Sequence, residues 1–212
     1  YLTPMAAVAG AVAQEIVAAY QRPGITRAWI NNGGDIALHL APGTQASVGL
    51  FADLARFDAG ELQRTAAGRL RTDGQFTVHA REAVRGVATS GWRGRSHSRG
   101  IADSVTVLAA TAAQADAAAT VVANAVDVDD AAIRRAPAHT LRDDSDLGGL
   151  LVTVDVPPLA AAQVQKALER GLACAQALQA RGLIHAAVLV CQGSLARLPA
   201  AQPLEWVAEL VQ

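Results

Sequence analysis

An aspartate and a threonine stand four residues apart in a segment that otherwise consists largely of alanine and valine. These residues, Asp116 and Thr120, lie on one face if the segment is helical. Their carboxylate and hydroxyl oxygens suit a hard cation such as Mg2+, which keeps several waters and therefore needs few protein ligands. A single aspartate on a helix usually faces solvent, but on so apolar a surface it also suits a partner or a cation. We predict that Asp116 and Thr120 hold Mg2+.

Two glycine-containing segments offer groups that bind anions. The backbone N–H groups of the turn at residues 31–35 could hold a phosphate, although Asn-Gly is also a frequent hairpin turn. The segment at residues 89–95 combines small N–H and hydroxyl groups with two arginines, whose guanidinium groups fit phosphate and carboxylate. The usual alternative for this second segment is a solvated loop. The ligand-binding residues that we predict are Asn32, Gly33, Gly34, Asp35, Thr89, Ser90, Gly91, Arg93 and Arg95.

His97 follows these arginines and is the predicted catalytic residue, because an imidazole can act as a general acid or base near neutral pH. A lone histidine in a loop is more often simply exposed. Several common signatures are absent: the sequence has no GxGxxG or Walker A motif, no GxSxG elbow and no cluster with zinc-ligand spacing. The chemistry that remains is Mg2+-assisted binding or transfer of a small phosphorylated molecule.

Composition limits the classes of partner. The chain has 212 residues, of which 51% are hydrophobic and only 4% aromatic, and its net charge is −1. A chain this hydrophobic can build a core from alanine, valine and leucine, and disorder is not expected. The near-neutral charge argues against binding to nucleic acid or to a membrane surface, so we expect a small-molecule ligand. With 17% charged residues the polar surface is limited, and we predict a homodimer.

The sequence also suggests a compartment. No uninterrupted apolar window reaches the length of a membrane span and no signal peptide is visible, so we expect a cytoplasmic protein. The two cysteines, Cys174 and Cys191, are then expected to be reduced and unpaired.

Hairpins and long helices must position these residues. The first helix, residues 5–20, has a small and apolar first half, which predicts that it is largely buried against residues 104–109 and the helix after them. Thr111 is the expected N-cap of that second helix. The Asn-Gly turn predicts a hairpin over residues 28–40. The other predicted elements are strands at 47–51, 75–80, 83–88, 104–109, 150–156 and 185–191, helices at 111–125, 129–135 and 160–181, and a surface loop at 139–149, whereas residues 54–71 fit no single element.

This order of elements lacks the regular alternation of strand and helix that is typical of a doubly wound parallel sheet. It predicts an α+β fold with mainly antiparallel strands and packed helices. A chain of this length can form a single domain over residues 1–212, or two closely packed lobes.

Four segments resemble, in order, the signature blocks of ApbE-like proteins. They are the helix at residues 5–20, INNGGDI at 30–36, ATSG at 88–91 and SVTVLAATAAQADAAAT at 104–120. ApbE itself is a Mg2+-dependent enzyme that transfers FMN from FAD to a threonine of a target flavoprotein. The resemblance covers roughly the first two-thirds of the chain. It implies the ApbE-like fold, FAD or FMN as a ligand, and a metal at Asp116 and Thr120.

The sequence departs from the ApbE pattern at three places. Ala9 and Gly10 stand where the family has a Lys-Gly pair, and Gln14 replaces a later aspartate. Only residues 92–103 span the gap in which the enzyme has a histidine and an Asp-Pro-x-Thr-Gly motif. This pattern resembles a small ApbE-related branch once labelled thiamine biosynthesis ApbE-related. We therefore expect binding of a nucleotide-like or phosphorylated small molecule with Mg2+; the alternative is an active Mg2+-dependent flavin transferase or another phosphotransfer-type enzyme.

Overall fold

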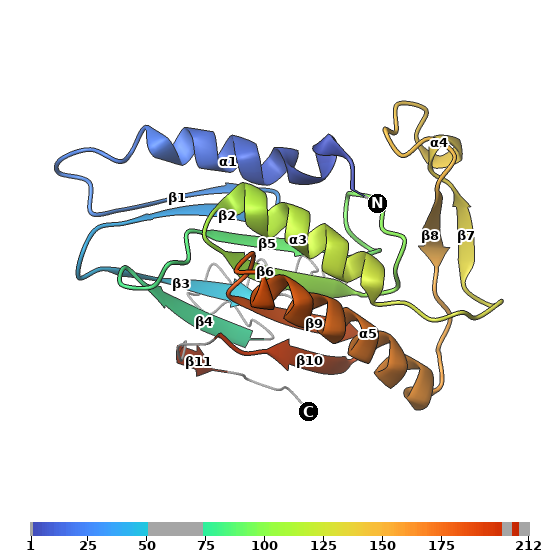
Figure 1. Ribbon diagram of the computed structural model, residues 1–212. Helices are drawn as coiled ribbons and strands as arrows, with labels where there is room; N and C mark the ends of the chain where they lie inside the picture. The colour runs from blue at the N-terminus through green and yellow to red at the C-terminus, as the bar shows by residue number, and fades with distance from the viewer. Residues whose placement is uncertain (1, 51–73, 201–204, 208–212) are drawn as a thin grey trace, which may run out of the picture.

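A six-stranded sheet forms the centre of the described structure (Figure 1). The computed structural model describes residues 2–50 and 74–200, and the backbone of Glu205–Val207. Every neighbouring pair of strands in this sheet is antiparallel. In sheet order the strands are β1 (Arg27–Asn32), β2 (Asp35–Leu40), β5 (Gly86–Ser90), β6 (Ser104–Ala109), β9 (Ala186–Cys191) and β10 (Ser194–Leu198).

Helices cover one face of this sheet (Figure 1). They are α1 (Val8–Ala18), which continues from a 3-10 turn (Pro4–Ala7), α3 (Ala112–Ala125) and α5 (Ala161–Ala180). α1 packs on β1, β2 and α3, whereas α3 lies on β5 and β6, and α5 lies on β9 and β10. Among the described residues, no helix has both the length and the apolar character needed to cross a membrane.

A second sheet covers part of the opposite face. Its strands, in order, are β11 (Glu205–Val207), β4 (Gly74–His79) and β3 (Gln45–Leu50). Because side chains alternate along a strand, the six-stranded sheet faces two cores. Ala88 of β5 belongs to the core under the helices, whereas its neighbour Val87 packs with Phe76 and Val78 of the second sheet.

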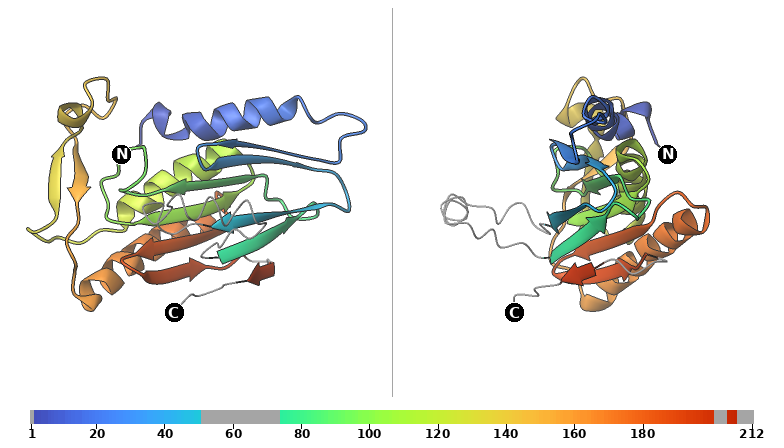
Figure 2. Two further views of the ribbon diagram at one scale, coloured as in Figure 1. Left: turned by 180° about the vertical axis from the view of Figure 1, so that it is seen from behind. Right: turned by 90° about the vertical axis from the view of Figure 1, so that its left-hand side faces the viewer.

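A two-stranded sheet stands off one end of the molecule (Figure 2). Its elements are β7 (Arg134–Pro137), the short helix α4 (Ala138–Leu141) and β8 (Leu151–Asp155). The helix predicted at residues 129–135 is wrong. Oδ1 of Asp130 accepts the N–H of Ala132, its carbonyl accepts the N–H of Ile133, and after this turn the chain enters β7.

The predicted fold class is confirmed, because antiparallel sheets and packed helices build the structure. The predicted hairpin is β1 and β2, and Thr111 caps α3 by accepting the N–H of Gln114. The strand predicted at 83–88 is shifted: β5 includes Thr89 and Ser90, which are therefore not part of a turn. The segment at 54–71, which the sequence left open, lies outside the described residues.

α1 is less buried than its composition predicts. It packs on α3 as expected, but its outward side is open, with Val8, Val12 and Ile16 exposed by 40%, 44% and 47%. The buried residues lie on the side that faces the sheet and α3; they are Gly10, Ala13 and Val17. The small residues on the buried side let α1 approach α3 and the sheet closely. The larger apolar residues of α1 point mainly away from α3 and the sheet.

We predict that Gly10→Ala destabilises the protein, because the glycine lies against the backbone of α3. A Cβ at this position would overlap the carbonyl oxygen of Ala112 and lie 2.9 Å from Cβ of Asp116, so the helices would have to separate. We expect a loss of roughly 1–3 kcal/mol in the free energy of unfolding in urea. Ala11→Leu, at the exposed next position, should change it by less than about 0.5 kcal/mol. Equal effects of the two substitutions would contradict the prediction.

Candidate functional site

Asp116 caps α1 across the interface between two helices. Its Oδ2 accepts the backbone N–H of Gly10 at 2.9 Å, and the N–H of Ala9 also donates to the carboxylate. These N–H groups belong to the first turn of α1, whose own N-cap residue, Ala7, provides no side-chain hydrogen bond. The carboxylate thus lies at the positive end of the helix, which stabilises its negative charge.

Asp35 lies near Asp116 and is also partly buried. It begins β2 and points to the same face as Ala37, which packs against α1 and α3. Its Oδ1 is buried and has no hydrogen-bond partner among the described residues. Burial and the charge of Asp116 raise the pKa of Asp35 to about 7. A hydrogen bond from the backbone of Thr89 and the charge of Arg95 act in the opposite direction.

The turn between β1 and β2 is tied to the first turn of α1. Gly33 and Gly34 have φ angles of 71° and 111°, which glycine adopts without strain. Oδ1 of Asn31 accepts the N–H of Gly34 at 2.8 Å and closes the turn. Nδ2 of Asn32 donates to the carbonyl of Ala9 at 3.1 Å, which fixes the turn beside the helix start that Asp116 caps.

The Arg95 side chain lies directly over this turn. A Cβ added at Gly33 would overlap Nη2 of Arg95, so the guanidinium group lies against the backbone of this glycine. Arg95 is exposed, and its positive charge lowers the pKa of Asp35. Segments that are distant in the sequence therefore meet at one place, which we call the site cluster: Asn32, Gly33, Asp35, Thr89, Arg95 and Asp116.

The chemistry of the site cluster suits a hard cation. Burial raises the pKa of Asp116, while the N–H groups of Gly10 and Ala9 lower it. Two partly buried carboxylates repel each other, and either a proton or a cation removes that repulsion. Within the described ranges, no group of three or more His, Cys, Asp or Glu side chains could hold a metal. A cation would therefore need hydroxyl, backbone or water oxygens as well, a mixture that Mg2+ accepts.

Thr120 could supply one such hydroxyl. It lies one turn after Asp116 on α3 and is half-buried. In the described part of the chain its hydroxyl makes no hydrogen bond, so its oxygen is not already committed to a protein partner. The four-residue spacing places it on the same side of α3 as the carboxylate.

Three predicted ligand residues have structural roles beside the cluster. Ser90 ends β5 and is half-buried. Gly91 packs so tightly on the backbone of Asp103 that a Cβ would overlap the Asp103 carbonyl oxygen. Arg93 stacks over Trp92, with Cζ 4.9 Å from the ring centre, and its Nε lies 3.4 Å from Oδ1 of Asp103. Asp103 thus anchors this loop.

His97 lies next to a residue that joins the two-stranded sheet, because the carbonyl of Ser98 accepts the N–H of Thr153 in β8 at 2.8 Å. His97 is half-buried, and its Nε2 is buried without a hydrogen-bond partner among the described residues. Burial and, to a smaller extent, the positive charge of Arg142 lower the pKa of His97. Arg142 directly follows α4. In the described structure no contact joins His97 to the carboxylates.

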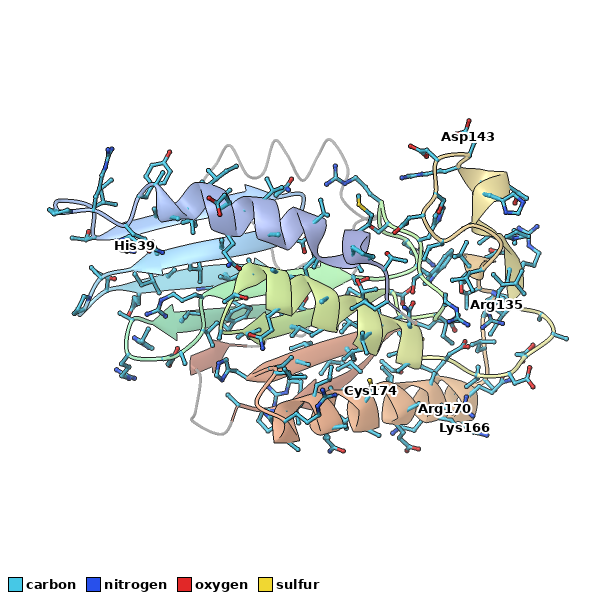
Figure 3. All side chains as sticks on the ribbon, turned by 45° about the horizontal axis from the view of Figure 1, so that its top comes forward. His39, Arg135, Asp143, Lys166, Arg170 and Cys174 are labelled. Atoms are coloured by element: carbon cyan, nitrogen blue, oxygen red, sulfur yellow. The ribbon has the colours of Figure 1, made fainter. Side chains whose placement is uncertain are left out.

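A cavity of about 380 Å³ lies under the C-terminal half of α1, apart from the site cluster. Figure 3 shows His39 at this end of the β1–β2 hairpin, far from the glycine turn. Arg85, which lines this cavity, donates to the carbonyls of Ala80, Glu82 and Val84, and these bonds fix the loop before β5. Sequence reasoning missed His39 and Arg85, because neither falls in a motif. The polar lining consists of Gln14, Glu15, Gln21, His39, Arg85 and Thr111.

Comparison with known protein families identifies the chain's relatives. The family described as "AbpE bacteria" matches residues 1–197. The chain belongs to this family. The matched residues include every member of the site cluster, from Asn32 to Asp116, and also α1, whose first turn Asp116 caps.

Curated proteins of the UPF0280 group are also similar to this AbpE-family chain. A UPF0280 protein of Methanospirillum hungatei is 36% identical over 140 residues, which cover 64% of this chain and 50% of the relative. One from Methanothrix thermoacetophila is 33% identical over 173 residues, 78% of this chain and 65% of the relative. One from Methanopyrus kandleri is 40% identical over 136 residues, which cover 63% of this chain and 48% of the relative. The matched region thus spans about half to two-thirds of these relatives.

Proposed function

We propose that this protein binds a nucleotide-like or phosphorylated small molecule together with Mg2+ at the site cluster. The pair of Asp35 and Asp116 carries the proposal. Burial raises the pKa of both carboxyl groups, and Oδ1 of Asp35 is buried without a hydrogen-bond partner among the described residues. A cation would neutralise the pair and give that oxygen a partner, in the way that bound divalent ions reverse local repulsion between carboxylates.

The residues of the cluster fit separate roles. Asp116 and Thr120 would hold Mg2+, and Asp35 would be a further oxygen ligand. When bound, Mg2+ would supply positive charge that neutralises a phosphate group of the ligand. Arg95 is exposed over the glycine turn, where its guanidinium can pair with phosphate oxygens.

The resemblance of four sequence segments to ApbE-like proteins favours a second candidate function, that of an Mg2+-dependent transferase acting on FAD or FMN, or of another phosphotransfer-type enzyme. One local feature favours simple binding instead. Ala9 stands where ApbE enzymes carry a lysine, and its backbone N–H and carbonyl are bonded to Asp116 and Asn32. This position therefore serves the architecture of the cluster and offers no amine to a ligand.

We expect the purified protein to bind FAD, FMN or ADP more tightly in the presence of Mg2+. Isothermal titration at pH 8, with each ligand and with MgCl2 present or absent, measures this directly. A ligand at 100 times its Kd should also stabilise the fold by about 2.7 kcal/mol. Asp35→Asn and Asp116→Asn should abolish the Mg2+-dependent part of the affinity. Asp129→Asn, at an exposed position outside the cluster, should bind as the wild type does.

Two results would count against this proposal. One is nucleotide binding that is equal with and without Mg2+, and the other is Mg2+-dependent binding that both carboxylate variants retain. Transfer of FMN from FAD to a threonine-containing target protein would instead support the transferase.

A further inference from the structure

An apolar stripe runs along the outward face of α1. Val8, Val12 and Ile16 follow one another at four-residue intervals in α1. Two more exposed apolar residues flank the helix, Met5 in the preceding 3-10 turn and Tyr20 just after its end. Residues four apart on a helix lie on the same side. All five side chains are between 39% and 58% exposed. We call these five residues the α1 stripe.

Among the described residues, the fold leaves the α1 stripe about half exposed. The opposite side of α1 already packs on β1, β2 and α3, and Figure 1 shows α1 as an outer layer of the molecule. α1 contains one charged residue, Glu15, and the stripe contains none. Single exposed apolar residues are ordinary, but a continuous row of them marks a contact surface.

The stripe is nearly symmetric about Val12. Val8 and Ile16 lie four residues on either side of it, and Met5 and Tyr20 lie at the two ends. If two copies of α1 pack antiparallel with Val12 of each at the centre, Val8 of one copy faces Ile16 of the other, and the same contact repeats by symmetry. A two-fold interface requires this self-complementarity. We propose that a second copy of this chain covers the α1 stripe in this arrangement.

The charge of the helix fits the antiparallel pair. Glu15 lies three residues after Val12, so it comes beside the first turn of α1 in the second copy. That turn is the positive end of the helix dipole, which attracts a carboxylate. The two Glu15 side chains lie on opposite sides of the axis, separated by roughly 9 Å along the helix, and therefore repel each other little. The α1 stripe itself thus carries no charge, and Asp116 already caps the same turn from the inner side of α1.

The length of the stripe sets the expected strength of the dimer. A stable interface covers about 800 Å² on each partner. Val8, Val12 and Ile16 span roughly 12 Å of α1. Together with Met5 and Tyr20 beyond the two ends of the helix, these partly exposed side chains supply the apolar centre of such an interface and part of its area. We therefore expect a reversible dimer with a Kd on the order of 1 μM.

The dimer would hold the helix that organises the site cluster. Ala9 and Gly10 donate to Asp116 from the inner side of α1, whereas the stripe lies on the outer side. Dimerisation would thus restrict the movement of α1 and leave the site cluster open. The inference does not depend on the proposed ligand, and loss of the dimer can be measured without any ligand.

Cysteine cross-linking tests the register. Cys174 is half-buried and Cys191 is buried, so the background variant is Cys174→Ser. Val12→Cys places a thiol at the axis, and diamide, which is itself reduced, oxidises the two thiols to one disulfide. We expect Val12→Cys to form covalent dimers, and a mixture of Val8→Cys and Ile16→Cys chains to cross-link faster than either chain alone. Leu195→Cys, at a side chain that is 45% exposed on β10, is the matched control and should cross-link slowly.

Sedimentation tests the assembly itself. Val12→Glu places two carboxylates at the axis and should raise the Kd at least about tenfold, measured from roughly 1 to 100 μM protein. Leu195→Glu should remain dimeric, and circular dichroism and urea unfolding show whether each variant is folded. A wild type that is monomeric throughout this range would overturn the proposal. So would cross-linking of Leu195→Cys as fast as that of Val12→Cys.

Discussion

The contribution of Asp35 to the free energy of unfolding is expected to fall as the pH rises from about 4 to about 7. The pKa of Asp35 is raised from 3.8 to about 7 in the folded protein, first by burial and then by the charge of Asp116. Between these values the folded state holds a proton that the unfolded state has lost, so removal of that proton favours unfolding. The stabilising contribution is complete below pH 4 and is lost as the pH passes 7.

Asp35→Asn should remove this dependence, because the amide has a similar shape and stays neutral. One pKa unit corresponds to about 1.4 kcal/mol, and partial contact with solvent reduces the effect. We therefore expect the variant to be roughly 2–4 kcal/mol more stable than the wild type at pH 8, and nearly equal to it below pH 4. Urea unfolding at pH 4, 6 and 8 provides the measurement.

The decisive quantity is the difference in the free energy of unfolding between Asp35→Asn and the wild type, because other carboxyl groups titrate in the same pH range. The pKa of Asp127 is also raised by burial, whereas hydrogen bonds from Ala132 and Gln163 lower the pKa of Asp130. These contributions cancel in the difference. Asp129→Asn is the exposed control and should follow the wild type. A difference between Asp35→Asn and the wild type that does not grow with pH would contradict the expectation.

Local sequence patterns were sufficient to predict many of the helices and strands. The run at residues 104–109 matches β6, because all six residues are buried and the following Thr111 caps the next helix. The Asn-Gly signal located the β1–β2 hairpin correctly. The helix expected at 129–135 failed because Asp130 stabilises a local turn, and pairing with β8 then extends the chain. Tertiary pairing of this kind leaves no periodic signal in the sequence.

The site was harder to predict because its contacts join distant segments through the backbone. Asp116 accepts its hydrogen bond from Gly10, 106 residues earlier in the chain, and a backbone N–H has no residue signature. The spacing of Asp116 and Thr120 suggested a metal site. The capping role of Asp116 could be recognised only once the position of α1 was known. Arg93 and Arg95 look equivalent in the sequence. Only the structure separates them, since Arg93 is held by Asp103 and Arg95 lies over the glycine turn.

Substitution of Asp116 should separate its capping role from its proposed role as a metal ligand. Asp116→Ala removes the acceptor for the N–H groups of Gly10 and Ala9, and loss of a helix cap costs about 0.5–2 kcal/mol. Asp116→Asn keeps an oxygen that can accept one of these bonds but removes the charge. We therefore expect Asp116→Ala to be about 1 kcal/mol less stable than Asp116→Asn, while both variants lose Mg2+-dependent ligand binding.

Hydrogen exchange provides the local measurement for this comparison. In Asp116→Ala the amide of Gly10 loses its acceptor, so it should exchange faster than in the wild type and in Asp116→Asn. Urea unfolding at pH 8 gives the global stability, and both carboxylate variants are compared at the same pH, because each relieves the repulsion of Asp35. Equal stability and equal Gly10 exchange in the two variants would rule out the capping role. Mg2+-dependent binding that survives in Asp116→Asn would rule out the metal role while leaving the capping role in place.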